Sequence, residues 1–187
     1  LQGLGFPAVV TGPNNEIWAA TSAGAAHFDG TKWISFRQDE GYPVPTYDVE
    51  SVAIASDGAV WFVQKDLKII RYHDGSWRTF SKSDGVDGAI SLSAAPDASI
   101  WAACGKNGLA KYDGVKWPRF VVPISPETGY TTLVFYYGAL WFDRHVEKVG
   151  LGCYKNDQWD MYRTESGPAY WYNLKGIVLD NNKTSTF

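Results

Sequence analysis

The sequence has little sulfur, few histidines and almost no excess of charge. It contains two cysteines, one methionine and three histidines, and 17 basic against 20 acidic residues give a formal net charge of −3. Cys104 and Cys153 are too few for a disulfide framework and lack the CxxC spacing of zinc or redox sites. We expect two small buried residues, with a single bridge between them left open. Without a basic excess, no nucleic-acid partner is expected.

Long apolar runs are also missing. No window approaches about eighteen consecutive apolar residues, so the sequence predicts no membrane span. The first ten residues, LQGLGFPAVV, lack the basic flank and the long apolar run of a signal peptide. The chain does not start with Met, which suggests a processed product or a piece of a longer protein.

Aromatic residues and glycine are abundant instead. Aromatics make up 16% of the 187 residues, with nine Trp and eleven Tyr, and there are nineteen Gly and nine Pro. Flat rings fit the cross-strand pairs of pleated sheets, while Gly and Pro mark turns. A hydrophobic content of 45% is enough to bury a core, so we expect one all-β domain.

Eight of the nine tryptophans repeat with a period of about 42 residues, which is typical of propeller blades. In each unit an aromatic residue precedes the second Trp by five positions, and another follows it by three. The motif occurs as FDGTKWISF, YHDGSWRTF, YDGVKWPRF and YKNDQWDMY. The two series are Trp18, Trp61, Trp101 and Trp141, and Trp33, Trp77, Trp117 and Trp159. We interpret these repeated rings as packing between blades.

Each unit is expected to form four short strands joined by hairpin turns. In the second unit they fall at 49–55, 59–64, 68–73 and 76–80. The sequence thus predicts a β-propeller with four blades of four antiparallel strands and the first strand of a possible fifth. We expect part of a larger ring, or a ring that a partner completes. The blades are expected at 7–37, 48–81, 89–121 and 131–163, with 172–187 starting a further blade or forming a closing strand.

Two pairs of segments carry a family resemblance: ASDGAVWFVQ with RYHDGSWRTF, and APDASIWAAC with GLAKYDGVKW. They resemble the two-component regulator propeller repeats of bacterial sensor domains, over about residues 8–162. The resemblance implies an extracytoplasmic propeller, periplasmic or at the cell surface, that senses or binds a ligand. The fourth unit departs from the pattern. It has Tyr137-Gly138 for Asp-Gly, a longer gap between Trp141 and Tyr154, and Lys155-Asn156-Asp157 for the usual Asp-Gly turn.

Candidate binding residues are expected on the propeller face where the loops between blades meet the turns between second and third strands. These loops vary in length and composition on a regular scaffold, which is typical of binding sites. Their rings could stack on sugars or anchor a protein, or they could cover the central channel and one another. The candidates are Tyr42, Tyr47, Asp48, Lys65, Asp66, Lys106, Asn107, Tyr130, Arg144, His145, Tyr170, Trp171 and Tyr172.

No catalytic set is visible in the sequence. His27, His73 and His145 occupy non-equivalent repeat positions and no metal-site spacing is present, so we expect no catalytic centre, metal or cofactor. The sequence favours a non-catalytic, extracytoplasmic module that senses a ligand or binds a protein. The expected partner is a protein or additional blades that complete the ring, with a small molecule or carbohydrate as the alternative ligand.

Two other functions stay open. One is a structural or accessory subunit whose incomplete ring packs on other proteins of an assembly. The other is an enzyme similar to the streptogramin lyases, propellers with a metal-assisted His and Glu site, to which only His145 and Glu147 could contribute. The role of His27 is open as well, because no other unit has histidine there. The equivalent residues are Arg71, Lys111 and Cys153.

Overall fold

The computed structural model describes residues 8–12, 15–21, 23–44, 49–64, 66, 68–120, 122, 129, 132–146 and 149–162. Within these ranges the regular elements are sixteen β-strands and two single-turn 3₁₀-helices, η2 (Gln38–Glu40) and η3 (Lys82–Asp84). In the part of the chain so described, no helix has the length and apolar character needed to cross a membrane.

The strands form four antiparallel sheets, here numbered blades 1 to 4 in chain order. Within each blade every strand pairs with the next one along the chain. Blade 1 contains β1 (Ala8–Thr11), β2 (Ile17–Thr21), β3 (Gly24–Phe28) and β4 (Trp33–Phe36); blade 2 contains β5 (Val49–Ile54), β6 (Val60–Gln64), β7 (Ile69–His73) and β8 (Ser76–Phe80); blade 3 contains β9 (Ser91–Ala94), β10 (Ile100–Ala103), β11 (Leu109–Lys111) and β12 (Arg119–Phe120); blade 4 contains β13 (Leu133–Tyr136), β14 (Ala139–Val146), β15 (Val149–Lys155) and β16 (Gln158–Tyr162).

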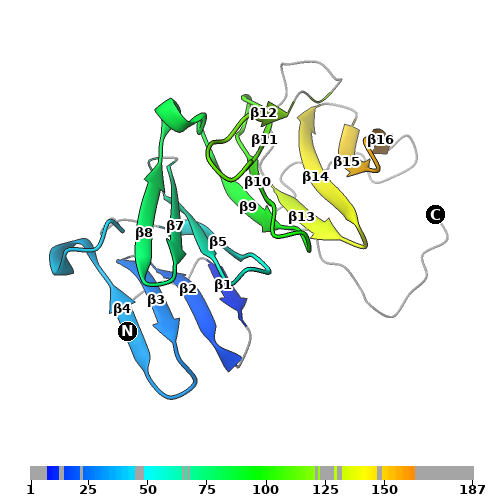
Figure 1. The fold of residues 1–187 in the computed structure, drawn as a ribbon. Coiled ribbons are helices and arrows are strands. Elements are labelled where there is room, and N and C mark those ends of the chain that lie inside the picture. The colour runs from blue at the N-terminus through cyan, green and yellow to red at the C-terminus, as the bar shows by residue number, and fades with distance from the viewer. Residues whose placement is uncertain are drawn as a thin grey trace.

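The four blades follow one another along an arc, with their first strands on its inner side (Figure 1). Strands β1, β5, β9 and β13 each contact the first strand of the neighbouring blade. This arrangement is a β-propeller, and it confirms the predicted all-β fold with four blades of four antiparallel strands. The strand expected to start at residue 172 lies outside the described residues.

Tight turns form where the sequence provides residues that tolerate a positive φ. Both residues of Asp74-Gly75, Tyr137-Gly138 and Asn156-Asp157 have positive φ, as two-residue hairpins require. Asp, Asn and Gly adopt this conformation at little cost, whereas a bulky residue such as Tyr137, with φ 47°, is strained in it. Asn156-Asp157 thus keeps the two-residue turn of Asp74-Gly75 in blade 2. Tyr137-Gly138 instead forms a shorter turn than its equivalent in blade 2, where Ile54 and Val60 are the last paired residues.

The first Trp of blades 1, 2 and 3 fills the junction between its own blade and the next. Trp18, Trp61 and Trp101 are each 2% exposed and lie in three separate apolar clusters, one at each junction. Large buried rings of this kind are a main source of packing energy. The predicted role of these three residues in blade packing is confirmed.

The aromatic contacts across the three junctions repeat one pattern. The first Trp of each blade reaches a Tyr on the third strand of the next blade. The ring centroids are 5.1 Å apart for Trp18 and Tyr72, 4.8 Å for Trp61 and Tyr112, and 5.6 Å for Trp101 and Tyr154. Each such Tyr also contacts the second Trp of its own blade, so every junction joins three rings.

The fourth blade has longer middle strands than the others. β14 has eight residues and β15 seven, whereas the second strands of blades 1 to 3 have four or five. This length explains why Trp141 and Tyr154 lie further apart in sequence than their equivalents. Arg144 and His145 were expected in the turn after the second strand; that placement is wrong, because β14 continues to Val146.

Candidate functional site

Four of the predicted site residues have described side chains: Tyr42, Asp66, Lys106 and Asn107. Arg144 and His145 are described as part of the backbone of β14, without their side chains. The remaining candidates lie outside the described residues. They are Tyr47, Asp48, Lys65, Tyr130, Tyr170, Trp171 and Tyr172.

Tyr42 and Asn107 hold neighbouring segments together. The half-buried Tyr42 ring meets the Phe36 ring edge to face at 5.0 Å and belongs to the cluster between blades 1 and 2. The Asn107 side-chain amide donates a hydrogen bond of 2.8 Å to the backbone carbonyl of Asp87. That bond ties the turn after β10 to the loop that enters blade 3. Both residues thus have packing or bracing contacts, and their part in binding stays a prediction.

Asp66 and Lys106 face solvent on the same end of the blades. The Asp66 carboxylate forms an ion pair with the ammonium group of Lys68, and both side chains are about half exposed. The exposed Lys106 forms no ion pair with an acidic side chain in the described ranges. These two residues are the described polar groups through which the predicted face could meet a ligand.

The opposite end of the blades, which we call the turn face, carries the turns between first and second strands and between third and fourth strands. Here a basic residue of the third strand lies directly across from the first Trp. In blade 1, His27 pairs with Trp18 and stacks on its indole, with centroids 4.2 Å apart. The Nε2 atom of His27 lies 3.1 Å from a carboxylate oxygen of Glu16. An acid, a base and an indole thus form one layer.

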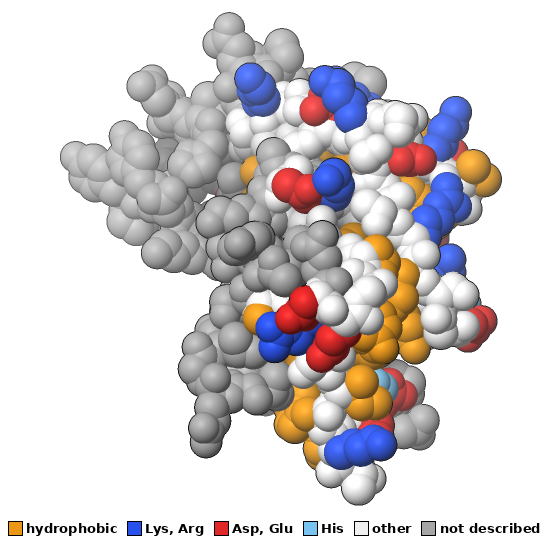
Figure 2. Space-filling model, turned by 90° about the vertical axis from the view of Figure 1, so that its left-hand side faces the viewer, with side chains coloured by type: hydrophobic (Ala, Val, Ile, Leu, Met, Phe, Trp, Pro, Cys, Tyr) orange, Lys and Arg blue, Asp and Glu red, His pale blue; other side chains and the backbone are white. Residues whose placement is uncertain are grey.

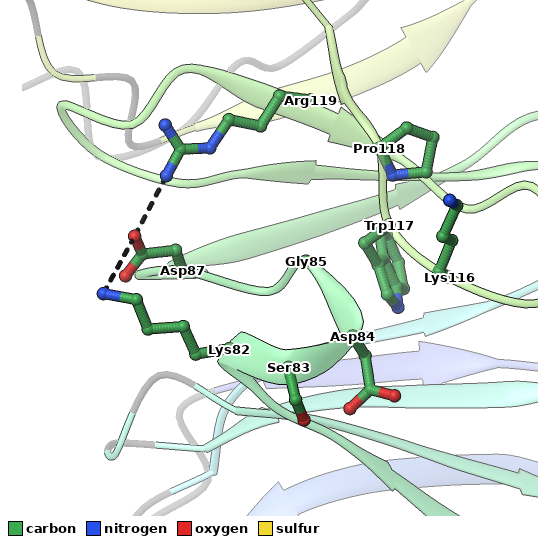
Figure 3. A pocket seen from close by; sticks show the side chains of 9 residues that line it. All are labelled: Lys82, Ser83, Asp84, Gly85, Asp87, Lys116, Trp117, Pro118 and Arg119. Atoms are coloured by element: carbon green, nitrogen blue, oxygen red, sulfur yellow. Dashed lines mark hydrogen bonds and ion pairs between the residues drawn. The ribbon is translucent and has the colours of Figure 1, made fainter.

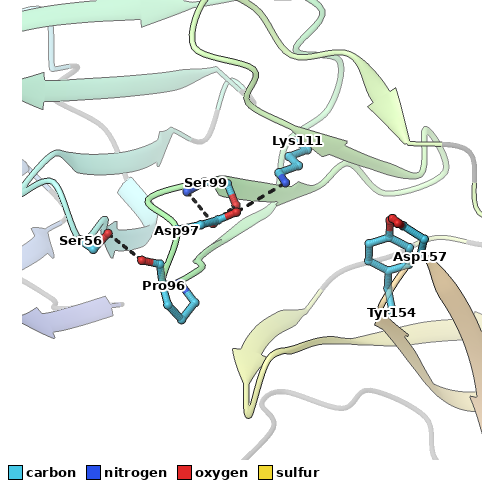
Figure 4. A network of polar contacts seen from close by, with 7 residues as sticks. All are labelled: Ser56, Pro96, Asp97, Ser99, Lys111, Tyr154 and Asp157. Atoms are coloured by element: carbon cyan, nitrogen blue, oxygen red, sulfur yellow. Dashed lines mark hydrogen bonds and ion pairs between the residues drawn. The ribbon is translucent and has the colours of Figure 1, made fainter.

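Blades 2 and 3 repeat this layer. The Arg71 guanidinium carbon lies 5.4 Å from the Trp61 ring centroid, and the Lys111 ammonium nitrogen lies 5.3 Å from that of Trp101. Such cation–π contacts stabilise by about 0.5–1 kcal/mol at exposed sites. Each cation also has an acidic neighbour from the first turn of its blade. The Arg71 guanidinium group lies 3.7 Å from the Asp57 carboxylate. The Lys111 ammonium group lies 3.9 Å from the Asp97 carboxylate (Figure 4).

A groove of about 590 Å³ opens on the turn face around these two ion pairs. Between the described residues Arg71 and Lys111 make no hydrogen bond to a protein acceptor, and the Nε atom of Arg71 and the indole nitrogen of Trp61 are buried without a partner. The groove therefore holds two cations that have acidic neighbours at 3.7 and 3.9 Å but no hydrogen bond to them. Its lining includes Asp57, Trp61, Arg71, Asp97, Lys111, Tyr112 and Asp113. We call it the turn-face groove.

Hydrogen bonds hold two carboxylates of this groove, those of Asp97 and Asp113, in their ionised form. The hydroxyl of Ser99 donates a hydrogen bond of 2.6 Å to Asp97 and lowers the pKa of that carboxyl, and its backbone N–H acts in the same direction. The backbone N–H groups of Lys116 and Val115 likewise lower the pKa of Asp113. Acceptors and donors therefore both line the groove at neutral pH.

Two further hollows adjoin the junctions of blades 2, 3 and 4. An apolar one of about 460 Å³ lies beside the groove, with the exposed ring of Tyr137 at its edge. A charged one of about 420 Å³ lies between η3 and β12 (Figure 3). There Arg119 donates a hydrogen bond of 3.0 Å to Asp87, which lies 3.6 Å from the ammonium nitrogen of Lys82. Figure 2 shows a hydrophobic area in the middle of the face that it draws, with acidic and basic side chains around it.

The described part of the chain contains no group of three or more His, Cys, Asp or Glu side chains that could hold a metal ion. Cys104 and Cys153 are both free and buried, so they are not bridged. Burial raises the pKa of the Cys104 thiol to about 11, which keeps it protonated and unreactive.

The turn-face groove was not among the predicted sites. A signal for it was present in the sequence, because His27, Arg71 and Lys111 are basic and occupy the same repeat position. The acidic partners follow the same rule, since they sit at or next to the first turn of each unit. The pairing of these two positions becomes visible only when the strand register is known.

Comparison with known proteins places the fold among β-propellers of several functions. No model of a protein family matches the chain, and no curated protein matches it in sequence. A catalytically inactive virginiamycin B lyase from Staphylococcus aureus, solved with quinupristin, is similar with a TM-score of 0.74 and 17% identity. The match covers 90% of this chain and 59% of the lyase.

Two other solved structures are similar at the same level. The extracellular domain of a protein described as a hybrid two-component system from B. thetaiotaomicron has a TM-score of 0.67 and 19% identity, over 86% of this chain and 23% of that one. YCF48 bound to D1 peptide has a TM-score of 0.60 and 13% identity, over 82% and 51%. The chain thus spans little more than half of the lyase and less of the sensor. Identities this low show a shared fold alone.

Proposed function

We propose that this chain is a non-catalytic, extracytoplasmic binding module that holds a segment of a protein partner in the turn-face groove. The observation that carries the proposal is the convergence of Arg71 and Lys111, both without a hydrogen-bond acceptor among the described residues, on one groove. An extended peptide presents backbone carbonyls to such donors and N–H groups to ionised acceptors. The aromatic walls of the groove favour its apolar side chains.

The comparisons support a binding role on this fold without specifying the ligand. One neighbour is an extracellular domain of a two-component system, and another is solved with a bound peptide. The first supports an extracytoplasmic sensing context and the second supports a peptide ligand. Fractionation of the native cells by osmotic shock, followed by immunoblotting, tests the location. Recovery with cytoplasmic markers would contradict it.

Peptide selection tests the binding role and separates the two faces of the propeller. A random peptide library displayed on phage is panned on the full chain, and the affinities of selected peptides are measured by calorimetry. The double variant Arg71→Gln/Lys111→Gln is expected to bind at least about tenfold more weakly, because each charged donor contributes over 1 kcal/mol. The matched double variant is Asp66→Asn/Lys106→Gln. It lies on the opposite face, here called the loop face, where the sequence predicts the binding residues, and it is expected to bind normally.

Each outcome of this comparison decides one question. Weakening by the loop-face variant alone would move the binding site to the residues predicted from the sequence. Failure to select any peptide above background would contradict a peptide ligand. The unfolding midpoint of each variant shows whether lost binding reflects lost folding, because Arg71 also covers the Trp61 ring.

A further inference from the structure

The apolar hollow of about 460 Å³ beside the turn-face groove lies near the ends of the first strands of blades 2, 3 and 4. Its lining includes Ile54, Ala94 and Phe135, which occupy one repeat position, because each pairs with the residue before the first Trp of its blade. The middle blade contributes only a methyl group at this position, whereas its two neighbours contribute large side chains. A space therefore opens between Ile54 and Phe135.

The apolar hollow differs from the groove in its chemistry. None of the described residues that line the hollow is charged, and most of them are alanine, proline or aromatic residues. The groove next to it holds Arg71 and Lys111 with their acidic neighbours. A ligand that contacts both must therefore present polar groups to the groove and an apolar group to the hollow, because burying an unpaired polar group is costly.

The groove and the hollow share a wall. Asp57 and Asp97 line the groove, and the residues immediately before them, Ser56 and Pro96, line the hollow. The Ser56 hydroxyl donates a hydrogen bond of 3.0 Å to the Pro96 carbonyl, which ties the two turns together (Figure 4). Consecutive Cα atoms are about 3.8 Å apart, so a bound peptide crosses this wall within a few residues.

Tyr137 stands at the rim of the hollow in a conformation that the fold does not favour. Its φ is 47°, where Asn, Asp or Gly costs less, and the residue is 75% exposed, so its ring recovers little burial energy. The Tyr136 ring meets it edge to face at 4.5 Å and holds it beside the opening. A strained residue with an exposed ring at the edge of a hollow is typical of a binding function.

We infer that the apolar hollow is the anchor site of the peptide that the turn-face groove holds. The inference rests on the proposed function and adds the class of its ligand, an extended segment in which a large apolar side chain, aromatic or branched aliphatic, adjoins the groove-bound residues. That side chain lies over Ala94, between Ile54 and Phe135, and the ring of Tyr137 covers it on binding. Buried anchors of this kind supply most of the affinity in protein interfaces.

Peptides selected on the full chain test the anchor site. We expect them to share one large apolar residue at a fixed distance from the residues whose binding depends on Arg71 and Lys111. Tyr137→Asn is expected to weaken binding at least about tenfold, whereas Tyr137→Phe keeps the ring and binds normally. Ala94→Leu, which fills the hollow, is expected to weaken binding as well. Trp33→Asn removes an exposed ring of blade 1 that lines neither the groove nor the hollow, and it serves as the matched control.

A double-mutant cycle links the anchor residue of the peptide to Tyr137. Alanine in place of the shared apolar residue is expected to weaken binding to the unsubstituted chain and to have little further effect on binding to Tyr137→Asn. Urea unfolding of each variant separates lost binding from lost folding. Tyr137→Asn relieves backbone strain and is expected to be no less stable than the unsubstituted chain, so its loss of binding reports on the ring.

Each result decides the inference. Peptides whose binding depends on Arg71 and Lys111 but not on Tyr137, or that share no apolar residue, would remove the anchor site and leave the proposed function intact. Equal losses in Tyr137→Asn and Trp33→Asn would also contradict the anchor. Failure to select any peptide, or peptides whose binding depends on the loop face, would overturn both the groove and the anchor site.

Discussion

His27 and Trp18 stack with their ring planes inclined by only 11°. The imidazole occupies the position that Arg71 and Lys111 occupy over their own tryptophans, and each of the three basic groups has an acidic neighbour at the first turn. In blades 1 to 3 a basic residue thus lies over the first Trp, and His27 is a member of that series, whereas blade 4 has Cys153 across from Trp141. Its position within the layer explains why it varies in identity while its neighbours repeat.

Replacing His27 tests whether the layer stabilises the fold. His27→Ala removes the stacked ring and the Glu16 contact, and we expect a loss of about 1 kcal/mol in the free energy of unfolding. His27→Arg is expected to retain or exceed the original stability, because arginine fills the same position in blade 2. Urea unfolding measures both. His73→Ala, which removes a pair with the exposed Asp74, provides the control. Equal losses in all three variants would contradict the layer.

The turn at Tyr137 stores backbone strain that a substitution can release. A left-handed conformation costs roughly 1–2 kcal/mol for residues other than Gly, Asn and Asp. Tyr137→Asn keeps φ near 47° at a lower cost, so we expect the free energy of unfolding to rise by about 1 kcal/mol. Thermal unfolding checks the sign. Tyr137→Val, which is β-branched, is expected to lower the melting temperature, and a rise would contradict the assignment of strain.

Gly85 and Gly75 have similar backbone conformations but differ in how closely other atoms approach them. Both have positive φ, so an alanine at either position carries the same kind of backbone cost. A Cβ atom at Gly85 would clash with the carbonyl oxygen of Trp117, whereas one at Gly75 meets open space. We expect Gly75→Ala to cost about 1 kcal/mol and Gly85→Ala several times as much. Comparable unfolding midpoints would show that η3 shifts without penalty.

The buried Cys104 thiol makes stability depend on alkaline pH. Burial raises its pKa to about 11 in the folded protein, while the unfolded thiol titrates near its ordinary value of about 8.5. Its contribution is complete below the lower value and is lost as pH rises toward the higher one. Urea unfolding at a series of pH values is expected to show a decline above about pH 8.5 that is shallower in Cys104→Ala. Identical slopes would contradict this linkage.

A direct assay separates the binding module from the lyase alternative. We expect no turnover of virginiamycin B at high protein concentration, as measured by chromatography, because the proposed groove carries no histidine. The lyase from S. aureus serves as the positive control. Turnover by this chain that His145→Ala or Glu147→Gln abolishes would establish an enzyme instead.

Strand positions were predictable because each depends on nearby residues. In blade 2 the observed strands agree with the prediction to within one residue at each end, since Asp-Gly turns and alternating apolar residues define them locally. The end of β14 was not predictable, because Arg144 and His145 lack any local signal that distinguishes strand from turn. Tyr42 was predicted only as a candidate binding residue, and the packing of its ring on Phe36 was not predictable, because that contact depends on how two blades meet.

The candidate site was less predictable than the fold for a related reason. Loop composition directed attention to the face of Asp66 and Lys106. The groove of Arg71 and Lys111 instead arises from antiparallel register, which sets a basic residue across from an indole and near a turn acid. Pairwise distances of this kind join residues ten or more positions apart, and single-residue patterns do not reveal them.

The uneven covering of the blades determines how the molecule loses structure. Among the described residues, blade 2 packs on blades 1 and 3, and blade 3 packs on blades 2 and 4. Blade 1 packs on blade 2 alone, and blade 4 on blade 3 alone. In a linear array of coupled repeats, an end unit opens by breaking one interface and an inner unit must break two. Amide protons of β6 and β10 therefore belong to the most protected unit, and hydrogen exchange should decrease from both ends toward Trp61.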